Sequence, residues 1–156
     1  MGVFNFSNAT IQSVSKVADR IHELVQVDQS LLMHNFVQAQ VSNGEAGFKV
    51  NATIGGFGAE GAQLTLGWQT PLLYQVVDSS LSRSLFDRVA TLGLAETNVL
   101  FEVQQSSLAG QFENAQADGV LEAPVRHFVV LSELDTIHVL ASEPPELAVH
   151  RLEPAA

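Results

Sequence analysis

The chain of 156 residues contains no cysteine and few basic side chains. Without cysteine, neither a disulfide framework nor a thiolate site can form. Only 7 Lys and Arg residues stand against 17 Asp and Glu residues, which gives a formal net charge of −10. Binding to nucleic acid or to an anionic membrane surface depends on clustered basic side chains, so the composition argues against both as partners.

Long apolar runs and targeting signals are missing as well. No apolar run approaches the roughly 18 residues that a membrane-spanning helix needs. The N-terminus has no basic region followed by a long apolar stretch, so we expect no signal peptide and either a cytoplasmic protein or one within an assembled particle. No linker or internal repeat divides the chain. We expect a single domain over 1–156, with a lead-in segment at 1–9 and a frayed tail at 153–156.

Charge of either sign is scarce. Charged residues make up 15% of the chain and apolar residues 46%, whereas about 25% of an average soluble domain is charged. A chain of this length can bury a sizeable core. One interpretation is a well-filled core under a neutral polar surface. The interpretation that we favour is that much of the surface is also buried against other copies of the chain, which predicts self-association.

A hairpin pattern between Phe36 and Ile54 is the strongest local signal in the chain. Asn43-Gly44 suits a type I′ turn, which needs positive φ at both central residues. Apolar residues alternate with polar ones on both sides of it, as in strands with one wet face. A two-residue loop at Asn43-Gly44 predicts three opposed pairs on one face: Val41 with Ala46, Ala39 with Phe48, and Val37 with Val50.

The other periodic segments predict an α+β fold. Steps of three and four residues between apolar positions predict a long N-terminal helix over Thr10–Leu32, packed on a mainly antiparallel sheet, and a further helix midway over Ser80–Leu92. A C-terminal β hairpin is expected around Ser132–Asp135. The remaining expected elements are strands at 62–68, 72–77, 99–103 and 147–152, hairpin strands at 125–131 and 136–141, and a short helix near 108–115.

Histidine provides the only constellation of side chains worth testing as a metal site. In the expected C-terminal hairpin, His127 and His138 lie on one face as diagonal neighbours, and His150 could join them from the last strand. Three imidazoles on adjacent strands are a possible zinc-ligand set. The tight ligand spacing of zinc motifs is missing, so the sequence favours ordinary strand histidines and no bound metal.

No nucleophile–base motif or carboxylate pair stands out, so we expect no catalytic residue, no cofactor and no enzymatic activity. The sequence favours an acidic structural subunit that self-assembles into a homo-oligomer, such as a shell, virion, tail or filament component, with other structural proteins as further partners. The expected subunit contacts are Phe4, Phe6, Phe57 and Asp28. One alternative is a small-ligand binding module with an apolar cleft between helix and sheet. A metal-assisted hydrolase that uses the strand histidines is another.

Overall fold

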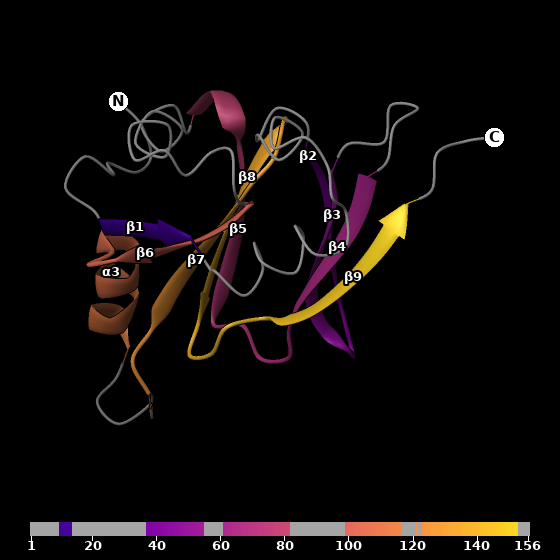
Figure 1. Ribbon diagram of the computed structural model, residues 1–156. Helices are drawn as coiled ribbons and strands as arrows, with labels where there is room; N and C mark the ends of the chain where they lie inside the picture. The colour runs from indigo at the N-terminus through magenta and orange to yellow at the C-terminus, as the bar shows by residue number, and fades with distance from the viewer. Residues whose placement is uncertain are drawn as a thin grey trace.

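The computed structural model describes residues 10–13, 37–54, 61–81, 99–116, 121 and 123–152. In these residues, two antiparallel sheets face each other across a shared core (Figure 1). One sheet has the strand order β1-β6-β7-β8-β5 and the other β2-β3-β4-β9. The strands are β1 (Thr10–Ser13), β2 (Val37–Gly44), β3 (Gly47–Ile54), β4 (Gly61–Trp68), β5 (Leu73–Asp78), β6 (Leu100–Gln104), β7 (Arg126–Leu131), β8 (Asp135–Ala141) and β9 (Glu146–Leu152).

The predicted α+β class is wrong, because the described residues are mostly β. The predicted N-terminal helix does not begin at Thr10, since Thr10–Ser13 is strand β1 and pairs with β6. Its remaining residues, 14–32, lie outside the described part of the chain. Local periodicity could not reveal a partner strand about ninety residues away, and that long-range pairing overrides the local pattern.

Helices make up little of the described structure. Residues Ser79–Leu81 form the short 3₁₀ helix η3, where the second helix was predicted to start, and residues 82–92 lie outside the described ranges. The nine-residue helix α3 (Ser107–Ala115) confirms the short helix predicted near 108–115. In the described ranges, no helix is long and apolar enough to cross a bilayer.

The hairpin of β2 and β3 exists, but its predicted register is wrong. Val41 lies opposite Val50, and the turn is at 45–46, two residues later than expected. Because the displacement is even, the apolar side chains that stay in the two strands keep their predicted face, whereas Ala46 lies in the turn. The new turn places Gly47 at φ 93°, where an added Cβ would lie 2.5 Å from the Trp68 carbonyl oxygen. Alternation determined the face, and the approach of β4 selected the register.

The shared core is built by alternate residues of the central strands. In the four-stranded sheet it takes Phe48 and Val50 from β3 and Leu64 and Leu66 from β4, all fully buried. The intervening residues of β3 and β4 are exposed or half-buried. The five-stranded sheet supplies its share from β6, β7 and β8: Leu100, Phe128, Val130, Ile137, Val139 and Ala141.

The five-stranded sheet is also buried on the face that points away from the core. Every residue of β7 from His127 to Leu131 is buried, so its side chains on both faces are covered. Helix α3 contacts β7 and lies on this outer face in Figure 1. The outer face therefore encloses a second dry environment, in which two histidines lie.

Candidate functional site

A chain of three polar side chains runs through the outer face of the five-stranded sheet. The Ser106 Oγ lies 2.7 Å from His127 Nδ1, and His127 Nε2 lies 2.8 Å from His138 Nδ1. His127 pairs with Leu140, and His138 with Val129, so the two histidines are diagonal neighbours on β7 and β8, as predicted. Both are at least 99% buried, with exposed fractions of 1% and 0%.

Ser106 connects this chain to helix α3. It is the N-cap residue, and its Oγ accepts a hydrogen bond of 3.1 Å from the backbone N–H of Ala109. Since an oxygen that accepts this bond keeps its hydroxyl proton, Ser106 can donate to His127 Nδ1. The neutral His127 then carries its proton on Nε2 and donates it to His138. One hydroxyl thus caps the helix and attaches it to two strands.

Burial suppresses the charge on both rings. It lowers the pKa of His127 to about 3, with the nearby His138 ring as a further cause. Burial also lowers the pKa of His138 to about 4. Both imidazoles are therefore neutral at pH 7. A general base works best with a pKa near the working pH. His127 and His138 are therefore weak bases, although their arrangement with Ser106 resembles a serine–histidine relay.

The three predicted metal candidates do not come together. His150 is on β9, in the other sheet, where it pairs with Gln63 and is exposed. Within the residues that the structure describes, no group of three His, Cys, Asp or Glu side chains could hold a metal ion. A catalytic zinc site requires three protein ligands, and the described part of the chain brings only two histidines together here.

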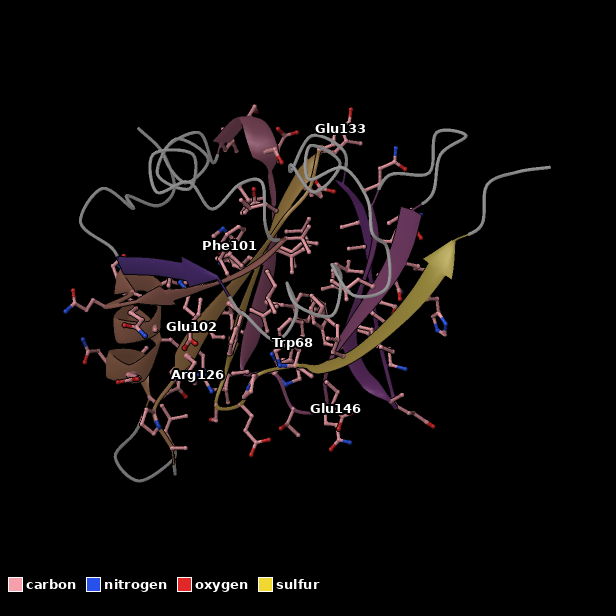
Figure 2. The ribbon with its side chains drawn as sticks, in the orientation of Figure 1. Trp68, Phe101, Glu102, Arg126, Glu133 and Glu146 are labelled. Atoms are coloured by element: carbon pink, nitrogen blue, oxygen red, sulfur yellow. The ribbon has the colours of Figure 1, made fainter. Side chains whose placement is uncertain are left out.

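An ion pair closes the core at one margin of the five-stranded sheet. Arg126 donates two hydrogen bonds of 2.8 Å to the two carboxylate oxygens of Glu102 (Figure 2). The guanidinium carbon lies 5.1 Å from the centre of the Phe128 ring. Hydrogen bonding to Glu102 raises the pKa of Arg126. Glu102 and Arg126 thus cover a core aromatic ring with a paired, hydrogen-bonded charge.

Among the described residues, no such cover lies over the opposite margin of the core. Val41 on β2, and Tyr74 and Val76 on β5, are paired with the core residues Val50, Val139 and Ile137. Residues directly opposite each other in an antiparallel pair share a face, so all three side chains point between the sheets. They are nevertheless 40%, 41% and 46% exposed.

Two further apolar side chains extend this exposed margin. Leu134, in the β7–β8 turn, is 71% exposed, and Leu81, in η3, is 55% exposed. The backbone N–H of Ser79 donates to the Leu134 carbonyl, which ties η3 to that turn. We call the margin formed by β2, β5, η3 and the β7–β8 turn the open side. It contains all the large apolar side chains that are exposed in the described residues.

The two sheets meet at one end of the open side and separate at the other. Near the β2–β3 turn, the Asn43 amide donates to the Tyr74 hydroxyl at 3.3 Å, and the Phe48 and Tyr74 rings stack with centroids 4.2 Å apart. Toward the other end, a cavity of about 230 Å³ lies between β2 and the β7–β8 turn. This cavity therefore opens at the surface of the open side, where Ala39 and Leu134 line it.

The predicted contact residues cannot be compared with this surface. Phe4, Phe6, Asp28 and Phe57 all lie outside the described residues. Sequence reasoning missed Val41, because alternation alone assigned its face to the core, and it assigned no face to Tyr74 or Val76. It also missed Ser106, whose signal is its position just before a helix, at an N-cap.

No known protein family, curated protein or solved structure matches this chain. The comparisons therefore lend no support to a virion or other particle context.

Proposed function

We propose that the protein is a non-enzymatic assembly subunit that associates with copies of itself through the open side. The observation that supports this proposal is the exposure of Val41, Tyr74 and Val76 at positions that point into the core. A monomer leaves these side chains in water, where their apolar area weakens the core they belong to. A second copy placed against the open side removes them from water.

The charge of the chain favours the same surface. Two copies that each carry a net charge of −10 repel each other wherever acidic groups approach. The exposed residues of β2 and the central residues of β5 carry no ionisable side chain apart from the Tyr74 phenol. Association through β2 and the centre of β5 keeps like charges apart there, whereas Asp78, Glu133 and Asp135 lie at the η3 end of the open side, where apolar burial must outweigh their repulsion.

The enzymatic alternative has less support. A hydrolase that uses the strand histidines would need either a third metal ligand or a base of suitable strength. His150 is on the other sheet, and burial holds the His127 pKa at about 3. The buried hydrogen bonds that join Ser106, His127 and His138 are better explained as a polar network that attaches α3 to β7 and β8.

The small-ligand alternative also lacks a specific observation in its favour. Its expected cleft involved the predicted N-terminal helix, most of which lies outside the described residues. The cavity on the open side and a second one beside Trp68 measure about 230 and 200 Å³. Both are smaller than the roughly 300–1,000 Å³ of typical ligand pockets.

Light scattering on a sizing column, at two protein concentrations and with and without chelator, tests the proposal. We expect a discrete assembly with a mass that is a multiple of 16.8 kDa and does not depend on chelator. A monomer of 16.8 kDa at both concentrations would overturn the proposal.

A matched pair of variants tests the surface. Val76→Asp adds a carboxylate to the open side and is expected to lower the assembly mass, because charge is costly in an apolar contact. Gln63→Asp adds the same charge on β4, on the half-buried face away from the core, and is expected to leave the mass unchanged. Equal masses for both variants and the wild type would contradict a contact at Val76.

A further inference from the structure

Edge strands present unpaired backbone groups, and proteins usually protect them by shortness, charge, proline or bulges. Three edges of the described sheets carry such protection. Strand β1 has only four residues. Strand β5 ends in Asp78, which lies opposite Asp135 on β8. Strand β9 carries Glu146 and His150.

Strand β2 differs from these three edges. It has eight residues, Val37–Gly44, with no ionisable side chain and no proline. Among the described residues it pairs with β3 only, so its other edge faces away from the sheet. A long, uncharged edge beside exposed apolar side chains is the pattern expected of a strand that pairs with another chain.

We propose that β2 pairs antiparallel with β2 of a second copy around a two-fold axis perpendicular to the four-stranded sheet. This inference rests on the proposed self-association and names its interface. The two four-stranded sheets become one continuous sheet of eight strands. The contact is isologous, since each copy offers the same strand to the other.

The register of this pair follows from the faces of the strand. Residues directly opposite each other across an antiparallel pair share a face, so core-facing Ala39 and Val41 must meet core-facing residues of the second copy. The two-fold axis therefore passes midway between one residue of β2 and the same residue of the second copy. Near the centre of the strand that residue is Gln40 or Val41. Val41 then lies opposite Ala39 or Val41 of the second copy, and apolar groups meet on the core side.

The same axis explains the exposed side chains of β5. A rotation about an axis perpendicular to the sheets keeps each sheet in its own layer. The β5 edges of the two copies therefore face each other across the axis, in the layer of the five-stranded sheets. The second copy then covers the exposed core-facing rows of β2 and β5, including Val41, Tyr74 and Val76. One interface accounts for an unprotected edge and for an open core margin.

The natural lack of cysteine makes a crosslinking test direct. The β2 residue next to the two-fold axis lies opposite the same residue of the second copy. The two Cα atoms are then at the separation of about 4.4–6.8 Å that a disulfide spans. We expect mild oxidation to crosslink either Gln40→Cys or Val41→Cys into a covalent dimer. Ala148→Cys, an exposed position on the β9 edge of the same sheet, serves as the matched control and is expected to stay uncrosslinked.

A charge-insertion pair gives an independent readout. Gln40→Lys is expected to reduce the mass measured by light scattering by at least half, whereas Ala148→Lys is expected to keep the wild-type mass. Circular dichroism checks that both variants retain the wild-type fold.

The outcomes separate this inference from the proposed function. A monomeric wild type overturns both. An oligomeric wild type in which neither β2 cysteine crosslinks, and in which Gln40→Lys keeps its mass, overturns β2 pairing while leaving self-association in place. Loss of mass in both lysine variants overturns the two-fold arrangement, because it indicates head-to-tail pairing of β2 with β9.

Discussion

The two sheets share a core but differ on their outer faces. On the four-stranded sheet, the outward residues of β3 and β4 are exposed or half-buried, and Thr65 donates to the Asn51 side chain at 2.9 Å. On the five-stranded sheet, the outward residues of β7 and β8 are buried, and two polar side chains among them, His127 and His138, are hydrogen-bonded to each other, with His127 also bonded to Ser106. The same strand geometry thus serves a wet face in one layer and a dry face in the other. Substitutions of the same chemistry should therefore have different effects in the two sheets.

The largest difference is expected for an inserted charge. Val129→Asp places a carboxylate on the dry outer face, where Val129 is fully buried, and should lower the free energy of unfolding by roughly 4 kcal/mol or more. Gln63→Asp on the wet face should change it by about 0.5 kcal/mol. Urea unfolding followed by fluorescence of Trp68, the single tryptophan, measures both. Equal losses for the two variants would mean that the two outer faces do not differ.

Acid should destabilise the dry face next. Burial lowers the pKa of His127 and His138 from 6.5 to about 3 and 4. Below pH 6.5 the unfolded chain takes up protons that the folded chain does not. The contribution of the two neutral histidines to the free energy of unfolding is therefore fully present above pH 6.5. It falls as the pH drops toward 4, by up to about 1.4 kcal/mol per pH unit for each histidine.

Urea unfolding at pH 7.5, 6 and 5 measures this slope. The double variant His127→Gln/His138→Gln should flatten it, and His150→Gln, on the exposed β9 position, should leave it unchanged. A wild-type stability that stays constant from pH 7.5 to 5 would contradict a buried neutral pair.

The smallest expected difference concerns a single hydroxyl on each face. Ser106→Ala removes the cap of α3 and a hydrogen bond to buried His127, and should lower the free energy of unfolding by about 1–2 kcal/mol. Thr65→Val removes the wet-face hydrogen bond to Asn51, and water can replace that bond, so we expect about 0.5 kcal/mol or less. Thermal unfolding compares the two variants. A larger loss for Thr65→Val would reverse the assignment of wet and dry faces.

Part of this structure could be predicted from local patterns. Alternation correctly placed Phe48 and Val50 on one face of their strand. It also placed His127 and His138 side by side. In each case a period of two assigns the face, and the partner strand is close in sequence.

Other features depended on partners far away in the sequence. The strand at Thr10–Ser13 exists because β6 pairs with it, about ninety residues later. Ser106 joins the histidines across a separation of 21 residues. Neither separation leaves a local periodic signal. The local pattern therefore predicted a helix at Thr10–Ser13 and gave no prediction for Ser106.

The sequence by itself determined the faces of the strands, the position of the C-terminal hairpin and the scarcity of charge, because each depends on neighbouring residues or on composition. Only the tertiary structure decided that the strands divide into two layers, since the chain changes sheet from β1 to β2, from β4 to β5 and from β8 to β9. It also decided which core-facing residues are covered. A period of two gives the direction of a side chain, but its burial depends on the elements that the fold packs against it. Val41 and Val76 lie at the margin of the two layers and remain partly exposed there.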